Sequence, residues 1–400
     1  MRFVIVLVSM FFLSVLPLWS TAQKIKADKR LLAAADSYLA AAAAQYKVLQ
    51  KQLPADKFPK TYFPTTSKYE WSNSGWWCSG FYPGTLLYLY EATKDSSLYN
   101  EAMRILQVLE KEKNNTATHD LGFMMYCSFG NANRLQPKSG YNEILLTSAK
   151  SLCTRFNPTT GCIKSWDSKK GDYLVIIDNM MNLELLFWAT RYSGDSSFYK
   201  IAVTHANTTL KNHFRADNSS YHVLNYNSET GAVQQKRTAQ GFADSSAWAR
   251  GQAWGLYGYT TTYRETKDVR YLQQANAIAA FILVHPRLPA DKVPYWDFDA
   301  NTIPNALRDA SAAAIIASAL LELKSYVNAK TAAQYVAAAT VILKNLSSSS
   351  YRATAGTNGG FILQHGVGHF PQQTEVDVPL TYGDYYYIEA LLRYKQLNRK

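Results

Sequence analysis

The apolar and polar positions along the chain predict pairs of helices that repeat. Three helix ends, EATKD (91–95), TRYSGD (190–195) and RETKD (264–268), are each followed by a second segment with apolar residues at helical spacing. The aspartate that closes each polar linker is a favoured N-cap for the next helix, and a short linker suits a tight turn between two helices. The chain is therefore predicted to consist of helical hairpins.

Further helices extend this pattern. A fourth pair is predicted over 308–326 and 330–346, and 29–50 and 383–396 supply additional helices. Repeated hairpins form an open solenoid or a closed toroid. The connections here are long and rich in glycine, aromatic and polar residues, and such loops on one face of a scaffold are where a cleft is built. These inserts span 65–81, 113–140, 157–179, 213–247, 286–306 and 347–382. We therefore predict an all-α toroid of six hairpins as a single domain over 23–400, with short strands in inserts such as 221–226.

The first 22 residues have the composition of a secretory signal. Arg2 gives a positive start, 3–18 are apolar, and 20–22 form a small-residue exit. We expect 1–22 to be removed and the mature protein to be exported to the periplasm or beyond the cell. No later stretch is long and apolar enough to span a bilayer, so stable membrane insertion is not expected.

The formal net charge of +12, or 12 − 1 = +11 without Arg2, indicates an anionic partner. Lysine and arginine are scattered along the chain, so nucleic acid is not the expected partner. An acidic carbohydrate fits an exported protein better, and a basic balance that serves only solubility is the alternative. The oligomeric state is not specified by the sequence.

The chain has four cysteines and no CxxC pair that would indicate zinc. Cys153 and Cys162 flank the turn-rich NPTTG, so an exported protein can form a local disulfide there. Four free or buried thiols are the alternative. His365 and His369 are four residues apart, but the glycines between them favour a loop over a zinc-binding helix. No metal or cofactor is expected.

A single carboxylate, Asp178, follows the apolar run 174–177 and precedes an amphipathic helical pattern. Apolar surroundings raise the pKa of a carboxyl group because they dehydrate its charged form, so Asp178 can hold or donate a proton near neutral pH. A plain helix N-cap is the alternative. Asp120, in HDLGF (119–123), lies at a similar loop-to-helix junction. If both acids converge at one end of the toroid, their repulsion raises one pKa, which suits acid/base chemistry.

Aromatic and basic side chains also concentrate in the inserts. The tryptophan- and glycine-rich stretch 71–84 offers flat platforms for sugar rings, with an aromatic plug as the alternative. Arg250 and Trp254, at i and i+4, share a helix face where the arginine can bind a carboxylate or sulfate beside the ring. The alternative is an arginine buried against an aromatic cluster, for which Asp244 is a candidate partner. The RDAS motif (308–311) predicts a helix start with an internal ion pair.

Five motifs occur together in an order that resembles glycoside hydrolase family 88, the unsaturated glucuronyl hydrolases: HDLGF, IIDNMMNLELLFWA, WARGQAWGLYGYT, YWDF and RDASAAAIIASALLEL. The resemblance extends from about residue 71 to residue 392. It implies an (α/α)6 barrel, which agrees with the hairpin repeat. It also implies a metal-independent hydrolase that removes a 4,5-unsaturated uronic acid from the non-reducing end of lyase-generated oligosaccharides, derived from a glycosaminoglycan or a similar acidic polysaccharide.

The resemblance assigns roles to nine residues. Asp178 is implied to protonate C4 of the enol-ether double bond and to help deprotonate the water that adds at C5, after which the hemiketal opens and expels the neighbouring sugar. Asp120 is implied to be the second essential acid, which orients the substrate or tunes Asp178. The implied substrate contacts are the stacking rings Trp77 and Phe81, the polar or anionic contacts Arg250 and His222, and His119, Gln240 and Trp254.

The loop LQHGVGHFPQQTEVDVP (363–379) departs from the family pattern. Some members contact a sulfate there through Ser and Lys, whereas this chain has Gly366, Gly368 and His369 with no nearby lysine. Recognition of a sulfated second sugar through this loop is therefore in doubt, and His369 can serve only if protonated. Two other functions stay open: an unsaturated rhamnogalacturonyl hydrolase acting on pectin fragments, and an inactive sugar-binding toroid, against which the presence of both aspartates argues.

Overall fold

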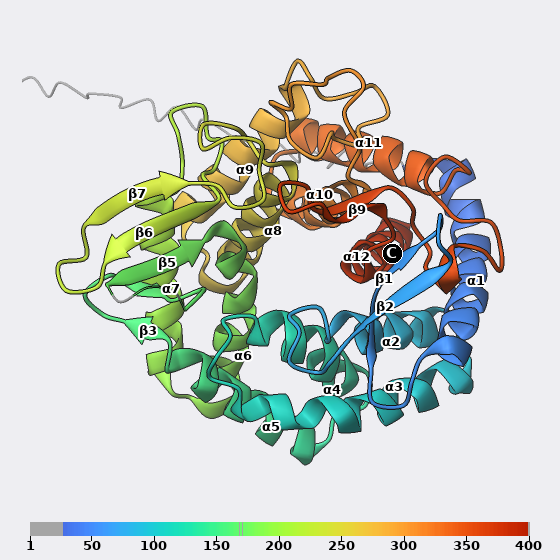
Figure 1. The fold of residues 1–400 in the computed structure, drawn as a ribbon, viewed down its shortest axis with the longest axis horizontal. Helices are drawn as coiled ribbons and strands as arrows, with labels where there is room; N and C mark the ends of the chain where they lie inside the picture. Colours follow the sequence, from blue (N-terminus) through green and yellow to red (C-terminus); the bar gives the residue numbers. More distant parts are fainter. Residues whose placement is uncertain (1–26, 168, 170, 399–400) are drawn as a thin grey trace, which may run out of the picture.

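The computed structural model describes residues 27–167, 169 and 171–398, and its helices form two concentric rings (Figure 1). The inner ring contains α2 (Phe81–Thr93), the π-helix η2 (Gly122–Gly130) with α4 (Asn131–Leu135), the 3-10 helix η3 (Ile177–Asn182) with α6 (Leu183–Ser193), α8 (Ala249–Thr266), α10 (Ala310–Leu323) and α12 (Thr381–Gln396). The outer ring contains α1 (Lys29–Gln52), α3 (Ser96–Leu109), α5 (Ser139–Cys153), α7 (Ser196–Asn212), α9 (Val269–Val284) and α11 (Ala329–Leu346). Because α12 packs against both α10 and α2, the inner ring closes, and the fold is the predicted (α/α)6 barrel. The predicted signal, 1–22, lies outside the described residues.

The predicted N-caps explain where three outer helices begin. Asp95, Asp195 and Asp268 each accept a hydrogen bond from the backbone N–H two residues later, which satisfies a donor that the first helical turn leaves free. The residue before each aspartate has a left-handed backbone, with φ of 61° at Lys94 and 76° at Gly194. These linkers therefore reverse the chain between an inner helix and its outer partner.

One inner helix follows the predicted loop-to-helix junction at Asp120 but lies inside a segment that was predicted as an insert. The insert expected over 113–140 contains η2 and α4, which run from Gly122 to Leu135. Phe123, Met124 and Met125 are buried, because a helix of the inner ring contacts its neighbours on nearly every side. Such a helix is apolar all round and lacks the amphipathic period by which the outer helices were recognised.

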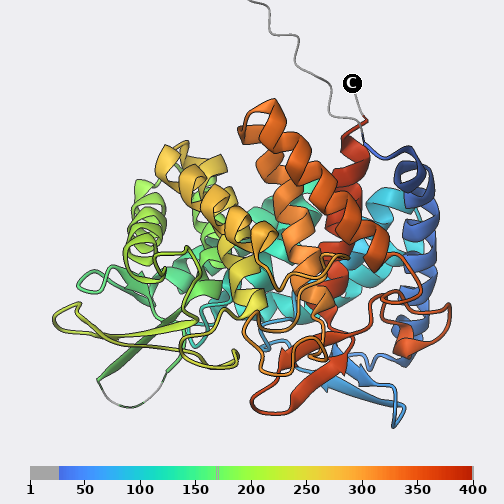
Figure 2. The same ribbon diagram turned by 90° about the horizontal axis from the view of Figure 1, so that it is seen from above.

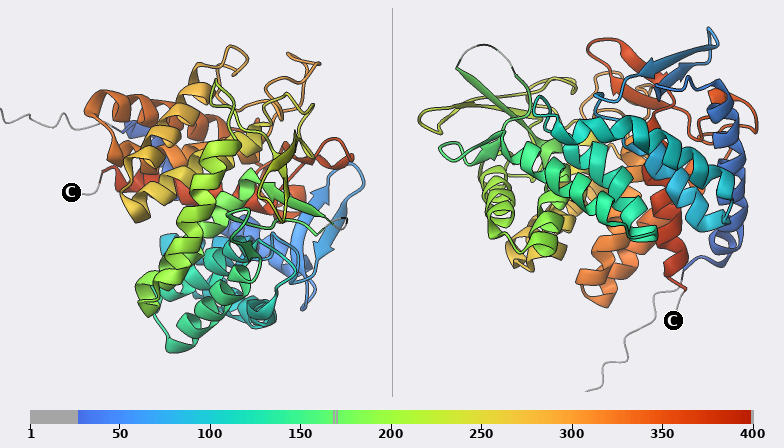
Figure 3. Two further views of the ribbon diagram at one scale, coloured as in Figure 1. Left: turned by 90° about the vertical axis from the view of Figure 1, so that its left-hand side faces the viewer. Right: turned by 90° about the horizontal axis from the view of Figure 1, so that it is seen from below.

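In the described part of the chain, short antiparallel strands form four small sheets, and they gather at one end of the barrel (Figures 2 and 3). The pairs are β1 (Phe58–Phe63) with β2 (Lys68–Ser72), β3 (Phe156–Asn157) with β4 (Cys162–Ile163), and β8 (Gly366–His369) with β9 (Thr374–Val378). The three-stranded sheet is β5 (Asp172–Ile176), β6 (Val223–Asn227) and β7 (Val233–Arg237). Shorter helical segments are η1 (Glu110–Asn114), η4 (Lys324–Tyr326) and η5 (Asn358–Gly360). The strand expected at 221–226 corresponds to β6.

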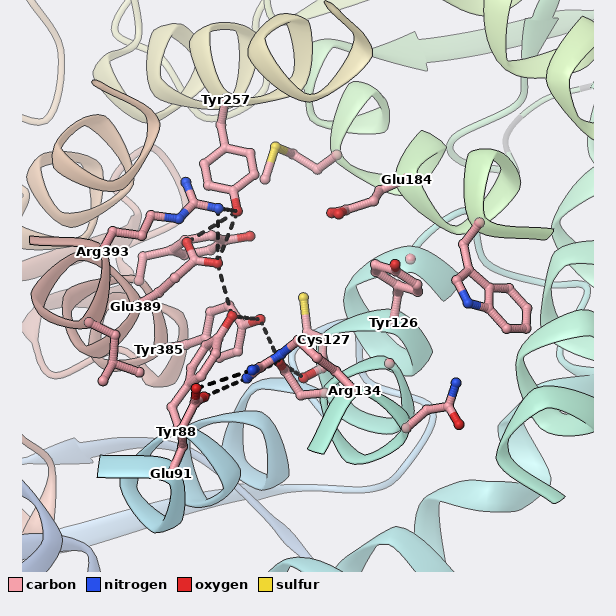
Figure 4. A pocket seen from close by; sticks show the side chains of 18 of the residues that line it. Tyr88, Glu91, Tyr126, Cys127, Arg134, Glu184, Tyr257, Tyr385, Glu389 and Arg393 are labelled. Carbon is pink, nitrogen blue, oxygen red and sulfur yellow. Dashed lines mark hydrogen bonds and ion pairs between the residues drawn. The ribbon is translucent and has the colours of Figure 1, made fainter. Parts of the chain in front are cut away.

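The opposite end of the barrel holds a cavity of about 420 Å³ with an internally paired charge network (Figure 4). Glu389 accepts hydrogen bonds from the hydroxyls of Tyr88 and Tyr257 and contacts the Arg393 guanidinium. Arg134 likewise donates to the Glu91 carboxylate. These bonds join α2, α4, α8 and α12, so the charges at this end neutralise one another and hold the inner ring together.

All four cysteines are free thiols, which decides between the two alternatives left by the sequence. Cys153 and Cys162 are therefore not joined. Within the described residues, no helix is both long and apolar enough to cross a membrane.

Candidate active site

A cleft of about 490 Å³ opens at the end of the barrel where the strands lie. The cleft is lined by residues near the N-terminal ends of η2, α8 and α12 and by the segment around η3. Segments that are distant in sequence therefore meet at the cleft. Six of the nine predicted site residues line it: Asp120, Asp178, Trp77, His119, Gln240 and Arg250. Other lining side chains include Lys60, Trp76, Phe123, Trp166, His369, Gln372, Thr374, Glu375 and Tyr382.

Asp178 lies in the first turn of η3, directly after β5. The N-cap of η3 is Ile176, and no side chain caps the helix, so the alternative of a plain N-cap is not what the structure shows. Asp178 is 8% exposed, and its Oδ2 atom has no hydrogen-bond partner. Burial raises the pKa of the Asp178 carboxyl to about 7, against the opposing effect of the Arg250 charge. A protonated carboxyl group is thus available at neutral pH.

His222 lies next to this carboxyl because β5 pairs with β6, and the backbone N–H of Ile177 donates to the His222 carbonyl. His222 Nδ1 accepts the backbone N–H groups of Ala239 and Gln240, each at 3.2 Å. Burial and the Arg250 charge hold the pKa of His222 well below its usual value, so the ring is neutral and its proton is on Nε2. That nitrogen is 3.7 Å from Asp178 Oδ2. The imidazole therefore presents an N–H toward the acid.

Asp120 is joined to the same centre through Asn182, which lies in η3 one helical turn after Asp178. Asn182 Nδ2 donates to Asp120 Oδ1 at 3.4 Å, and its Oδ1 accepts the backbone N–H of Phe123 at 3.0 Å. A Cβ atom on Gly122 would lie 2.5 Å from Asn182 Cα, so only glycine allows the two segments to approach this closely. The charge on Asp120 contributes to the raised pKa of Asp178. The predicted convergence of the two acids is confirmed.

Three predicted residues lie behind the cleft surface. Phe81 is 0% exposed and packs against Trp77 and Phe123, so it supports the cleft wall and does not present a stacking face. This corrects the expectation that Phe81 stacks on the sugar. His222 and Trp254 are also buried, and both lie close to Asp178. The Trp254 indole lowers the pKa of Asp178, although the indole N–H has no partner in hydrogen-bond geometry.

Arg250 is 1% exposed and packs over the rings of Trp248 and Tyr382, so the alternative of an arginine buried against an aromatic cluster is confirmed, whereas the partner expected for it, Asp244, is wrong. Its Nη1 atom pairs with Asp309 Oδ2 at 3.1 Å and also donates to the Val367 carbonyl, and its Nη2 donates to the Gly368 carbonyl at 2.6 Å. Only Nε lacks a partner. Arg250 thus anchors the β8 strand at the edge of the cleft.

The ion pair expected within RDAS is likewise wrong. Arg308 donates to the Asp291 carboxylate, whereas Asp309 caps α10 through the N–H of Ser311 and pairs with the distant Arg250. Asp309 and Asn182 are functional candidates that the sequence reasoning missed. Asn182 follows Asp178 by four residues in DNMMN, a spacing that could have indicated it.

Six of the buried side-chain polar atoms that lack a hydrogen-bond partner lie around the two acids. They are both ring nitrogens of His119, Asp178 Oδ2, His222 Nε2, Arg250 Nε and Trp254 Nε1. Buried polar groups are ordinarily satisfied, so this concentration indicates a place where a polar ligand supplies the missing bonds. Burial lowers the pKa of His119, which keeps it neutral beside Asp120, at 3.3 Å between Nε2 and Oδ1. The described residues include no group of three His, Cys, Asp or Glu side chains placed to share a metal ion.

The chain is similar to known proteins in both sequence and fold. The family model described as Glycosyl Hydrolase Family 88 matches residues 47–390. An unsaturated glucuronyl hydrolase of Formosa agariphila is 47% identical over 354 residues, which cover 88% of this chain and 88% of that protein. An unsaturated chondroitin disaccharide hydrolase of Streptococcus pneumoniae is 34% identical over 363 residues, covering 88% and 91%. The crystal structure of an unsaturated glucuronyl hydrolase specific for heparin matches with a TM-score of 0.89 at 44% identity, over 93% of this chain and 99% of that chain.

Proposed function

The chain belongs to glycosyl hydrolase family 88 and removes 4,5-unsaturated uronic acid from lyase-generated oligosaccharides, and we propose that Asp178 is the acid that starts this reaction on fragments of a glycosaminoglycan or a similar acidic polysaccharide. The observation that supports the role of Asp178 is a buried carboxyl on the cleft wall whose Oδ2 has no partner and whose pKa is raised to about 7. The net charge of +12 supports an acidic substrate. We also propose export, on the composition of 1–22.

The proposed reaction begins with proton transfer from Asp178 to C4 of the sugar. The double-bond electrons form the C4–H bond, and positive charge develops at C5, where it is shared with the ring oxygen. The Asp178 carboxylate then takes a proton from the water that adds at C5. The resulting hemiketal opens and releases the neighbouring sugar, so no covalent sugar–enzyme bond is needed, unlike in a retaining glycosidase.

The neighbouring residues assist this proton transfer. His222 directs its Nε2–H toward the Asp178 carboxyl, so it can stabilise the carboxylate after the proton has left. Burial raises the pKa of Asp178 and repulsion by Asp120 adds to this effect, while Asn182 fixes the relative position of the two acids. Trp77, His119, Gln240 and Arg250 also line the cleft, and we assign them to substrate contact.

The function is tested with unsaturated disaccharides prepared from chondroitin, hyaluronan, heparin and ulvan. Hydration of the double bond destroys the conjugated enol carboxylate, so we expect its ultraviolet absorbance to disappear with at least one of these substrates. Absorbance loss only with a pectin-derived unsaturated disaccharide would contradict the proposed substrate class. Binding without turnover of any substrate would contradict the proposed reaction.

The pH dependence of kcat/KM should follow the protonated form of Asp178. Because its pKa is raised from 3.8 to about 7, the proton remains bound up to neutral pH, and we expect kcat/KM to fall about tenfold per pH unit above that value. In Asp120→Asn the repulsive charge is removed, so the pKa of Asp178 should decrease and the fall should begin at a lower pH. Initial rates of absorbance loss measure both profiles. A decline that began near pH 4, or none up to pH 9, would contradict the assignment.

A further inference from the structure

The mouth of the cleft contains a set of charges that the proposed reaction does not use. We call Lys60, Trp76, Gln372, Thr374 and Glu375 the outer subsite; they come from β1, the loop before α2 and the β8–β9 hairpin. The unsaturated sugar must reach the buried Asp178, so the sugar that leaves lies toward these residues. The inference below rests on that proposed function.

Lys60 is the cation of the outer subsite, but two carboxylates already hold it. Its Nζ atom is 2.5 Å from Glu70 Oε1 and 3.8 Å from Glu375 Oε2, and it lies 4.9 Å from the centre of the Trp76 ring. The Lys60 side chain is 15% exposed and that of Glu375 is 12% exposed, so water screens this pair incompletely. Burial raises the pKa of Glu375 above its ordinary value and the Lys60 charge opposes this effect; when both carboxylates are ionised, the group carries one net negative charge.

No other described cation of the cleft is free to receive an anion here. Both Nη atoms of Arg250 are bonded to Asp309 and to the carbonyls of Val367 and Gly368. Burial and the Arg250 charge lower the pKa of His369, so its ring is neutral near pH 7. An anionic group at the outer subsite would therefore meet Glu375 without a compensating partner.

The glycine-rich strand β8 makes room for Glu375. Val367 pairs with Val376 and His369 with Thr374, which puts Gly368 opposite Glu375 in the hairpin. A Cβ atom on Gly368 would lie 2.6 Å from the Glu375 Cβ atom, so a larger residue could not occupy this position without displacing Glu375. The loop that lacks serine and lysine thus presents a carboxylate to the cleft.

We infer that Glu375 is a specificity-determining residue: it excludes a sulfate ester from the sugar next to the unsaturated uronic acid and accepts hydrogen bonds from hydroxyl or amide groups there. Two like charges that meet in a poorly screened site repel each other, and each tenfold difference in kcat/KM corresponds to about 1.4 kcal/mol. A preference of at least about tenfold for the unsulfated sugar is therefore expected.

The test compares Glu375→Gln with the wild type on the unsaturated chondroitin disaccharide and on its 4-sulfated and 6-sulfated forms. For the sulfate position that the wild type discriminates most, we expect the ratio of unsulfated to sulfated kcat/KM to fall about tenfold in the variant. Glu70→Gln is the matched control: it removes the other carboxylate at Lys60, which is 42% exposed and outside the cleft lining, so the ratio should change less than about twofold.

The inference would be overturned by a wild type with equal kcat/KM on sulfated and unsulfated substrates, or by an unchanged ratio in Glu375→Gln. An equal change of the ratio in Glu375→Gln and Glu70→Gln would also overturn it, because the selection would then come from the release of Lys60. Should Glu375→Gln not fold, the wild-type ratio can be measured with added salt, which should reduce it because screening weakens the repulsion. Dissociation constants measured in an Asp178→Asn background test the same ratio without turnover. A wild type that binds selectively but never hydrolyses would therefore contradict the proposed function alone.

Discussion

Asp178→Asn is expected to lower kcat by about 10²- to 10⁴-fold, the range that general acid/base groups supply. The amide has nearly the same shape but cannot deliver a proton to C4 or take one from water. Substrate should still bind, because Trp77, Gln240 and the rest of the cleft are unchanged. Initial rates of absorbance loss together with a dissociation constant separate the two effects. A variant that retained more than a tenth of the wild-type kcat would exclude Asp178 as the acid.

The same substitution should increase stability at alkaline pH. The pKa of Asp178 is raised from 3.8 to about 7 on folding, so between these values the native state binds more protons than the unfolded chain, and stability falls as the pH rises. A pKa difference of about three units corresponds to a loss of about 4 kcal/mol in the free energy of unfolding. This loss is complete only above pH 7. Denaturant unfolding should therefore show that Asp178→Asn is more stable than the wild type by up to about 4 kcal/mol at pH 8, with no such gain at pH 4.

Asp384 offers a matched control for the activity of that variant. Burial raises its pKa to about 7 as well, but its carboxylate accepts the N–H groups of Ile362 and Leu363, and it does not line the cleft. Asp384→Asn should consequently leave kcat within a few fold of the wild type. If both asparagine variants lost activity equally, a general effect of buried charge on the fold would replace the catalytic explanation.

The outer helices of this fold were predictable because their signals are local. An aspartate such as Asp95 caps the helix that immediately follows it, and one face of each outer helix is polar. The inner helix from Gly122 to Leu135 was indicated only by the junction at Asp120, since burial on nearly every side removes the amphipathic period that would have marked its extent. Strand β1 precedes the first predicted insert and was not predicted, and β9 was covered only by the general expectation of short strands in the inserts, because each is stabilised by pairing with a neighbouring strand rather than by its own composition.

The residues of the candidate site also fall into those that local sequence could indicate and those that it could not. Asp120 and Asp178 were identifiable because each carboxylate stands alone beside an apolar segment, and burial is what raises the pKa of Asp178. The partner of Arg250 was not identifiable: Asp244 is six positions away, whereas the true partner, Asp309, is 59 positions away and is brought near by closure of the barrel. The burial of Phe81 behind Trp77, which lines the cleft, likewise depends on the packing of α2 against its neighbours.

Arg250→Met is expected to destabilise the protein by about 3–5 kcal/mol, the usual consequence of removing one partner of a buried ion pair. Asp309 is 0% exposed, so its charge would remain in the interior without compensation, and the carbonyls of Val367 and Gly368 would lose their donors. The β8 strand would also lose its anchor at the cleft, which should raise KM. Urea unfolding and initial rates measure these two effects.

Two further variants test that explanation. Arg287 pairs with Asp299 at the surface, with side chains 48% and 43% exposed, and Arg287→Met should cost no more than about 1 kcal/mol. In the double variant Arg250→Met with Asp309→Asn the orphaned charge is absent, so the loss should be smaller than the sum of the two single losses. Strict additivity would show that Arg250 and Asp309 act independently, and an Arg250→Met protein as stable as the wild type would show that the buried pair does not hold β8 in place.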